Sequence, residues 1–247
     1  MLSQREQREL LITVIAELLE GVRHVAVGAS SPIPAAGAML LRARNEVGGR
    51  TPVRISILGS ARHNFFTDGA VEVFDCAAQG RIDAFFLGGG QIDGSGNINL
   101  VGTGDYPQSQ VRWPGSFGSA YLYHLVPRVI LFREEHSPRV LVPKVDFISA
   151  AATTPEVPRR GGPYALLTNM ALFAFDRQRA RFRLRSVHPP FSAADISDNT
   201  GFDYDTADVV PATPVPDAAT LALLRGRVLD ELAETYPAFA SLMAQAA

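Results

Sequence analysis

The sequence predicts an α/β fold in a single domain over residues 1–247, with a central, mostly parallel sheet, helices on both faces and a late antiparallel hairpin. Short apolar runs alternate with segments of helical periodicity, which is the order of a parallel α/β unit. Near the end, Arg181, Arg183 and Arg185 alternate with apolar residues after a polar turn, which is typical of a half-exposed hairpin strand. A chain of 247 residues is long enough for one such domain.

The helices and strands of the first half follow from apolar spacing. Residues 10–19 place Leu and Val on one helix face, and Gly21 ends that helix. We expect a strand over residues 24–27, then a loop and a helix over residues 35–44 that begins at Pro34 or Ser31. Apolar runs at residues 53–58 and 83–87 predict two more strands, and each of them ends at glycine.

The second half carries the remaining elements. We expect strands over residues 129–132, 140–142, 172–175 and 180–187, with the turn of the hairpin at residues 176–179. Residues 151–163 are the most loop-like stretch and indicate an active-site or interface loop. Asp217 is a suitable cap for a terminal helix that runs through Leu221, Leu224, Val228 and Leu232.

Composition excludes several classes of protein. Lys and Arg total 23 against 25 Asp and Glu, so the net charge of −2 gives no reason to expect nucleic acid or a membrane as partner. The single cysteine, Cys76, rules out a disulfide framework, and we expect it to be a small buried apolar side chain. Charged residues interrupt the start of the chain, and prolines and glycines interrupt residues 25–41, which favours a cytoplasmic protein.

A glycine-rich block at residues 88–105 follows a predicted strand and leaves two interpretations open. Glycine permits close approach of the backbone to a ligand, which makes Gly89, Gly90 and Asn97 candidate ligand contacts. The alternative is a turn that Asn and Asp side chains hydrogen-bond internally, with Asn97 and Asn99 on the same side. Neither a Walker loop nor a dinucleotide fingerprint is present.

Small residues also precede two of the predicted helices. The run Gly115, Ser116, Phe117 and Gly118 and the run that contains Gly28, Ser30 and Ser31 lie where backbone N–H groups can hold an anion or a developing oxyanion. A plain packing joint between strand and helix is the alternative. The five histidines show no metal-ligand spacing, so we expect no metal site, and no Gly-x-Ser-x-Gly motif is present.

An ordered series of motifs resembles the B-type chain of glutaconate CoA-transferase and its relatives, the family I coenzyme A-transferases. Each motif alone is weak, but their order along the whole chain is specific. The residues that carry the resemblance are Val27-Gly28, Gly37-Ala38, Gly88-Gly89, Gln91-Ile92-Asp93, Gly96-Asn97, Asn99, Gly104-Asp105-Tyr106, Gly115-Ser116, Gly118, His136, Arg139, Lys144-Val145-Asp146-Phe147 and Asn199-Thr200-Gly201-Phe202-Asp203.

The resemblance implies the open α/β fold of the NagB/RpiA/CoA-transferase type and an A-type partner subunit, usually in an α2β2 assembly. It implies coenzyme A as part of the substrate, an acyl-CoA thioester, with no metal or other cofactor. It also implies a glutamate nucleophile directly after a strand of the B-type chain. A carboxylate is required there because it forms an acyl anhydride and then a glutamyl-CoA thioester.

The sequence departs from this pattern at the strand that should carry the nucleophile. Leu58, Gly59 and Ser60 follow the matching strand, and no acid occurs between residues 53 and 67. The nearest carboxylates downstream are Asp68, Glu72 and Asp75; of these Glu72 is the one catalytic candidate, and Asp75 fits a polar helix position. Phe117 and Ser119 stand where the family resemblance implies Gly and Ala.

Three hypotheses follow from the missing glutamate. In the first, the chain is part of an enzyme whose chemistry has shifted to hydrolysis or C–C cleavage of an acyl-CoA, with catalytic groups from the A-type partner. In the second, it is part of an ordinary transferase that uses an acid elsewhere. In the third, it is a non-catalytic binding or regulatory subunit that only completes the fold and the interface.

Overall fold

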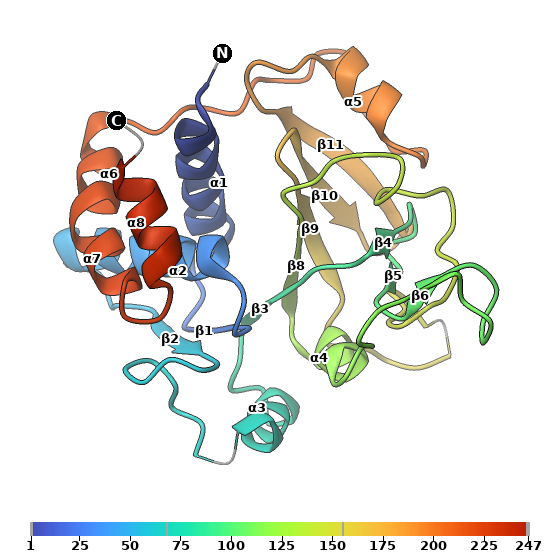
Figure 1. Cartoon of the computed structure of the whole chain (residues 1–247), viewed down its shortest axis with the longest axis horizontal. Coiled ribbons are helices and arrows are strands. Elements are labelled where there is room, and N and C mark those ends of the chain that lie inside the picture. Colours follow the sequence, from blue (N-terminus) through green and yellow to red (C-terminus); the bar gives the residue numbers. More distant parts are fainter. Residues whose placement is uncertain (1, 68, 155, 246–247) are drawn as a thin grey trace. The chain divides into compact units, whose positions relative to one another are not determined.

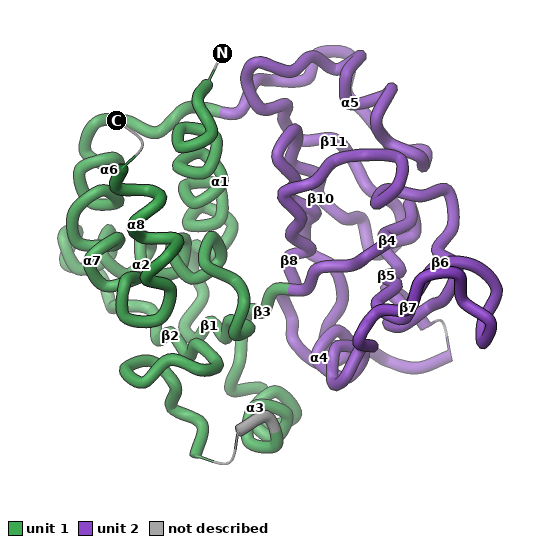
Figure 2. The backbone as a smooth tube through the Cα atoms, viewed as in Figure 1, with its two compact units in different colours: residues 1–86, 214–247 green, residues 87–213 purple. Residues whose placement is uncertain are grey.

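The computed structural model describes residues 2–67, 69–154 and 156–245 and divides into two compact units (Figure 2). Unit 1 combines the first 86 residues with the segment from Pro214 to the C-terminus, and unit 2 is Leu87–Thr213. That the whole chain behaves as one domain stays a prediction. Among the described residues, no helix combines the length and the apolar character needed to cross a bilayer.

Unit 1 is built on three parallel strands, as the sequence predicts. Strand β1 pairs with both of its neighbours, Val27 standing opposite Ile57 on one side and Val25 opposite Ala84 on the other. All four residues of β1 are buried, as expected for a parallel strand that is covered on both faces. The strands are β1 His24–Val27, β2 Arg54–Ile57 and β3 Ala84–Leu87 (Figure 1).

The helices of unit 1 confirm the predicted periodicity. Helix α1 begins with a capping box in which the Ser3 hydroxyl accepts from the Glu6 amide and the Glu6 carboxylate accepts from the Ser3 amide. Asp217 caps the terminal helix as predicted, and its carboxylate accepts from the Thr220 amide at 2.7 Å. The elements are α1 Gln4–Leu18, α2 Pro32–Val47, α3 Gly69–Ala78, α6 Ala218–Leu223, the π-helical turn η1 Leu224–Val228, α7 Leu229–Leu232 and α8 Pro237–Gln245.

Unit 2 contains the predicted hairpin beside a parallel strand pair. Strands β10 Ala171–Asp176 and β11 Arg181–Val187 pair antiparallel, and Arg183 and Arg185 are exposed while Phe182 and Leu184 are buried. Strand β9 Pro163–Leu167 pairs antiparallel with β10 and parallel with β8 Arg128–Phe132. The other elements are β4 Gln91–Ile92, β5 Ile98–Asn99, β6 Gly102–Thr103, β7 Val111–Arg112, α4 Ser119–Leu125 and α5 Ala193–Asn199.

Two local predictions are wrong. Residues 140–142 form no strand and make only an isolated bridge from Leu141 to Ile92. The neighbour, β4, is two residues long, so the pairing ends after two backbone hydrogen bonds, Ile92 to the Val140 carbonyl and Val142 to the Ile92 carbonyl. Cys76 is half-buried rather than buried, because it lies on α3 beside a surface cavity.

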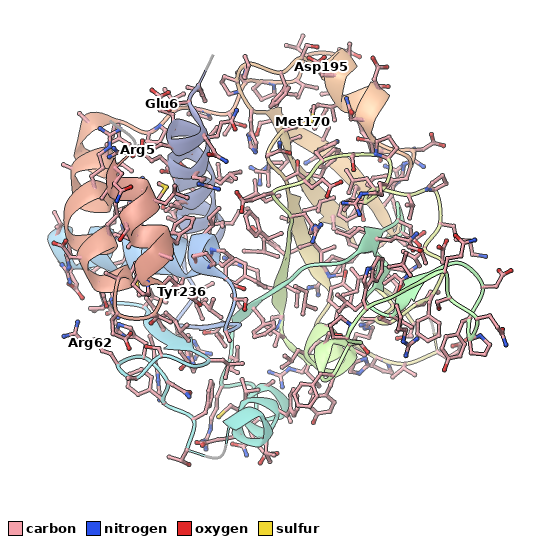
Figure 3. The ribbon with its side chains drawn as sticks, in the orientation of Figure 1. Arg5, Glu6, Arg62, Met170, Asp195 and Tyr236 are labelled. Carbon is pink, nitrogen blue, oxygen red and sulfur yellow. The ribbon has the colours of Figure 1, made fainter. Side chains whose placement is uncertain are left out.

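A buried carboxylate links α1 to the C-terminal helices of unit 1. The Glu9 side chain, 2 % exposed, accepts from both Nε and Nη2 of Arg225 at 2.8 Å and from Nε of Arg5 at 2.9 Å. Arg225 lies in η1, where the widened turn of a π-helix redirects side chains. Arg5, which Figure 3 labels, is a residue of α1. The pair therefore ties together segments 216 positions apart in sequence.

Replacement of Glu9 tests this link. We expect Glu9→Gln to lower the free energy of unfolding by about 2 kcal/mol, less than for a fully buried pair because Arg225 can still reach water. The matched control is Glu46→Gln, which removes a more exposed partner of Arg227 and should cost less than about 1 kcal/mol. Urea unfolding at pH 7 measures both; equal losses would contradict a special role for the buried carboxylate.

Two buried histidines organise the polar interior of unit 2. His136 contacts the hydroxyls of Thr168 at 2.7 Å and Thr200 at 2.9 Å through its two ring nitrogens. His188 contacts the Thr213 hydroxyl at 2.7 Å through Nδ1, and Thr213 donates to Ser186. Burial lowers the pKa of both histidines to about 4, so both are neutral at pH 7.

These pKa values predict an acid-sensitive stability. The unfolded chain takes up the two protons below pH 6.5, whereas the folded chain resists them until about pH 4, so stability falls as the pH drops through this window. The slope of the free energy of unfolding against pH approaches about 1.4 kcal/mol per pH unit for each histidine. Urea unfolding at several pH values between 7.5 and 5 measures this slope. The double variant His136→Gln/His188→Gln should have a shallower slope and His124→Gln should keep it; an unchanged slope in the double variant would refute the assignment.

Candidate functional site

The first part of the candidate site is the loop between β1 and α2. Gly28 follows the last residue of β1, Ser30 is exposed, and Ser31 is the N-cap of α2 but makes no side-chain capping bond. The Gly28 carbonyl accepts from the hydroxyl of Tyr236, a residue that follows α7 (Figure 3), at 3.1 Å. The 16-residue helix α2 therefore begins at a short loop with accessible hydroxyls, as the sequence predicts.

The loop after β2 lies beside the first loop. Because β1 and β2 are parallel and in register, their carboxyl ends lie at one edge, and the Leu58 amide donates to the Val27 carbonyl at 3.0 Å. Gly59 has a φ of +86°, a conformation that glycine adopts without strain. A Cβ atom at Gly59 would lie 3.8 Å from the Cβ of Ala29. The structure thus brings Gly28–Ser31 and Leu58–Ser60 together.

Two carboxylates that the sequence analysis did not single out, Glu234 and Glu231, contact residues 60–63 after β2. Glu234, an exposed residue after α7, accepts from the Ser60 hydroxyl at 2.7 Å and from the Ala61 and Arg62 amides at 2.9 and 3.3 Å. Its carboxylate also accepts from the Thr235 hydroxyl at 2.6 Å. These bonds, the Thr235 and Ser60 hydroxyls first, lower the pKa of Glu234 to about 2.

Glu231 is the second of these carboxylates, one helical turn before Glu234. Its Oε1 lies 2.8 Å from Nε2 of His63 and also pairs with Arg42 of α2. Burial lowers the pKa of His63, although the neighbouring Glu231 opposes that shift. No local motif marks Glu231 or Glu234, because both lie more than 160 positions from the loop that they contact.

Glu72, the weak catalytic candidate, lies elsewhere in unit 1. Its carboxylate accepts from the Thr67 hydroxyl at 2.8 Å at the start of α3. It lines a cavity together with His24 and Arg54, the first residues of β1 and β2. The structure therefore places Glu72 toward the amino ends of these strands, away from Leu58–Ser60. Asp75 is an exposed position of α3, as predicted, whereas Asp68 lies outside the described residues.

In unit 2, the glycines that follow β3 are packed tightly. A Cβ atom at Gly90 would lie 2.3 Å from the ring of Trp113, and one at Gly89 would lie 2.6 Å from the Gln91 carbonyl oxygen. Glycine is required at both positions because other parts of the same unit occupy the space of a side chain. This close packing fits the structural interpretation of the block, and a ligand contact by Gly89 or Gly90 stays a prediction.

Asn97 belongs to an internal hydrogen-bond network. Its side-chain amide donates to the Asp93 carboxylate at 3.1 Å, and its side-chain oxygen accepts from the Ala152 amide at 3.1 Å. The buried Asn99 donates to the Gln91 side chain and to the Gly102 carbonyl, both at 2.7 Å. These bonds fold the glycine-rich block on itself, and a role of Asn97 in ligand binding stays a prediction.

The turn before α4 is more open than the glycine-rich block. Gly115 has a φ of +102°, and no atom lies within 4 Å of the position of a Cβ there. Phe117 has a φ of +39°, which is strained for a non-glycine residue, and its side chain is 86 % exposed. Ser116 and Gly118 are half-buried on either side. Of the predicted contacts in unit 2, Phe117 is the one exposed residue.

Among the described residues, no group of three or more His, Cys, Asp or Glu side chains is placed to hold a metal ion. In unit 1 the two loops offer backbone amides and the hydroxyls of Ser30 and Ser31, and in unit 2 the turn before α4 offers backbone amides and the Ser116 hydroxyl. Within each unit such amides and hydroxyls suit the binding of an anion or an oxyanion.

The chain is similar in sequence to proteins of one known family. The family model described as "Coenzyme A transferase" matches residues 22–199. The chain is 29 % identical over 151 residues to the B-type chain of glutaconate CoA-transferase from Acidaminococcus fermentans, a match that covers 58 % of this chain and 56 % of that protein. It is 30 % identical over 166 residues to the IpdB chain of the cholesterol ring-cleaving hydrolase from Rhodococcus jostii, with 64 % of each covered. The matches span less than two thirds of these curated relatives.

The fold is also found among solved structures. A chain of the decarboxylase AibA/AibB superposes with a TM-score of 0.75, covering 92 % of this chain and 98 % of that one, at 24 % sequence identity. At this identity the likeness establishes the fold alone. A chain of glutaconate coenzyme A-transferase from Acidaminococcus fermentans also superposes with a TM-score of 0.75, covering 89 % of this chain and 93 % of that one, at 23 % identity. These likenesses confirm the predicted CoA-transferase-like α/β fold.

The segment that carries Ser60 to His63 should depend on Glu234. We expect Glu234→Gln to speed hydrogen exchange of the Ala61 and Arg62 amides about tenfold, because a neutral amide accepts more weakly than a carboxylate. The control is Asp230→Asn, an exposed position on α7 with the same change of charge. Exchange measured by NMR or mass spectrometry at pH 7 tests this, and equal exchange in both variants would show that the carboxylate is not needed.

Proposed function

The chain belongs to the coenzyme A transferase family, and we propose that it is the B-type subunit of a two-chain enzyme that acts on acyl-CoA thioesters. An α2β2 assembly with an A-type partner in the cytoplasm is part of this proposal. Support comes from the similarity to the B-type chains of glutaconate CoA-transferase and of the ring-cleaving hydrolase. Coenzyme A enters as part of the substrate, with no metal or other cofactor required.

The proposed chemistry is based on the absence of a carboxylate from the loop after β2. Leu58, Gly59 and Ser60 offer no carboxylate where the family resemblance implies the nucleophile. Glu234, which contacts this loop, is occupied by four hydrogen bonds and has a pKa of about 2. Attack by this carboxylate on a thioester would break those bonds, and its low basicity makes it a weak nucleophile.

A reaction without a covalent glutamyl intermediate therefore fits the chain better than standard CoA transfer. We propose hydrolysis or C–C cleavage of an acyl-CoA, with catalytic groups supplied by the A-type partner. Two similar proteins carry names of this kind, a ring-cleaving hydrolase and a decarboxylase. In this scheme there are two separate candidates for a backbone contact to the thioester oxygen or to CoA. One is Gly28–Ser31 in unit 1 and the other is Gly115–Gly118 in unit 2.

The alternative is a non-catalytic binding or regulatory subunit of the same fold. The same missing acid favours it, because a subunit without a nucleophile can still complete a site built by its partner. The two hypotheses differ in whether this chain's loops affect the chemical step.

Co-purification with a candidate A-type chain tests the proposal. We expect the two chains to form a complex that cleaves or hydrolyses acyl-CoA, with no covalent CoA adduct on this chain by intact-mass spectrometry. Substitution of the open turn, Ser116→Ala with Phe117→Ala, should lower kcat by about tenfold or more if these loops contact the reacting thioester. An unchanged kcat would favour the non-catalytic role, and a CoA adduct on this chain would establish ordinary transfer.

Glutamate can be introduced after β2 at either Leu58 or Gly59, which gives a matched pair of variants. Gly59→Glu forces a positive φ on a non-glycine residue and should lower the free energy of unfolding by about 1–2 kcal/mol, whereas Leu58→Glu carries no such strain. Neither variant should become a fast transferase, because Phe117 also differs from the family pattern. Exchange of labelled CoA between acyl-CoA and a free carboxylate measures this; a large gain in Leu58→Glu would show that only the nucleophile was absent.

A further inference from the structure

The cavity of unit 1 that Glu72 lines lies toward the edge opposite the Leu58–Ser60 loop. Its volume is about 410 Å³, within the range of about 300–1,000 Å³ of small-molecule sites. It is lined by the first residues of β1 and β2, by the segment before β3 and by α3. The proposed acyl-CoA chemistry makes no use of it.

Two carboxylates and three arginines line this cavity. The Glu72 carboxylate accepts hydrogen bonds from the amide and the hydroxyl of Thr67. Arg23 pairs with Asp83 at 2.9 Å, so these two charges offset each other. Arg54 and Arg81 are exposed, and neither forms an ion pair with a carboxylate in the described part of the chain. Two arginines at one cavity are suited to a multiply charged anion, and phosphate in particular matches the planar fork of a guanidinium.

An aromatic ring adjoins these charges. Phe65 is 48 % exposed although it is large and apolar, and the guanidinium carbon of Arg54 lies 5.1 Å from its ring centroid. Phe65 and Arg54 both line the cavity. An exposed ring next to a stacked arginine is the arrangement on which flat bases stack in nucleotide-binding proteins.

We propose that this cavity binds a phosphate ester of an aromatic base, with its phosphate at Arg54 and Arg81 and its base against Phe65. A free nucleotide and the nucleotide end of CoA share this chemistry. The proposal does not rest on the reaction proposed above, because within unit 1 the cavity lies at the amino ends of β1 and β2 and the Leu58–Ser60 loop lies at their carboxyl ends.

The single cysteine supplies a specific reporter. Cys76 is half-buried and lines the same cavity, so a ligand there shields its thiol. We expect saturating ADP to slow alkylation of Cys76 by iodoacetamide at least fivefold in the full chain, with AMP and inorganic pyrophosphate less effective because each lacks a part of the ligand. CoA in place of ADP distinguishes the two sources of the nucleotide.

Variants of the two arginines test where the ligand binds. Arg54→Gln and Arg81→Gln should each weaken ADP binding about tenfold in calorimetric titrations and remove the protection of Cys76. Arg185→Gln, on the exposed side of β11 and outside the cavity, is the control with the same loss of charge. Urea unfolding of each variant separates weak binding from loss of fold.

Distinct results would overturn the proposal. Absence of protection and of binding heat with both ADP and CoA would exclude the site. If Arg185→Gln weakened ADP binding as much as the two cavity variants do, the binding would be general attraction to positive charge and not a specific site. Protection by pyrophosphate as strong as by ADP would exclude the role of Phe65. Failure of acyl-CoA cleavage by the complex, with ADP protection intact, would count against the proposed function alone.

Discussion

The parallel pairing of β1 with β2 is the constraint on which the candidate site of unit 1 depends. With Val27 opposite Ile57, both chain segments leave the sheet at the same level, and the Leu58 amide closes the junction on the Val27 carbonyl. The loop before α2 and the loop after β2 are neighbours for this reason alone. The residues after α7 then complete the edge, since Tyr236 contacts the first loop and Glu234 the segment after the second.

The sequence predicts the main strands and helices because their signals are local. The apolar runs of β1, β2 and β3, the cap at Asp217 and the alternating face of β11 are all confirmed. The two-residue strands β4 to β7 leave no such signal. Residues 140–142 have the composition of a strand but no neighbour long enough to form a ladder with them.

The candidate site is less predictable because its decisive contacts join distant segments. Glu231 and Glu234 reach a loop more than 160 residues away, and nothing in their local sequence distinguishes them from solvated helix positions. The glycine motifs show a second reason why the sequence does not predict the site. Gly90 is required by the ring of Trp113, whereas Gly115 faces open space, and composition alone does not separate these two uses of glycine. The absent acid after β2, in contrast, is visible in the sequence itself.

The division of unit 1 between both ends of the chain has a consequence for synthesis on the ribosome. Unit 2 is complete once Thr213 has emerged, whereas unit 1 still lacks its last three helices and the turn between them. Until then Glu9 has no Arg225, and the segment after Ser60 has no Glu234. The nascent chain therefore holds an unfinished amino-terminal half throughout translation of unit 2. The edge of unit 1 that carries Gly28–Ser31 and Leu58–Ser60 gains its contacts to Glu234 and Tyr236 only after all of unit 2 has been synthesised.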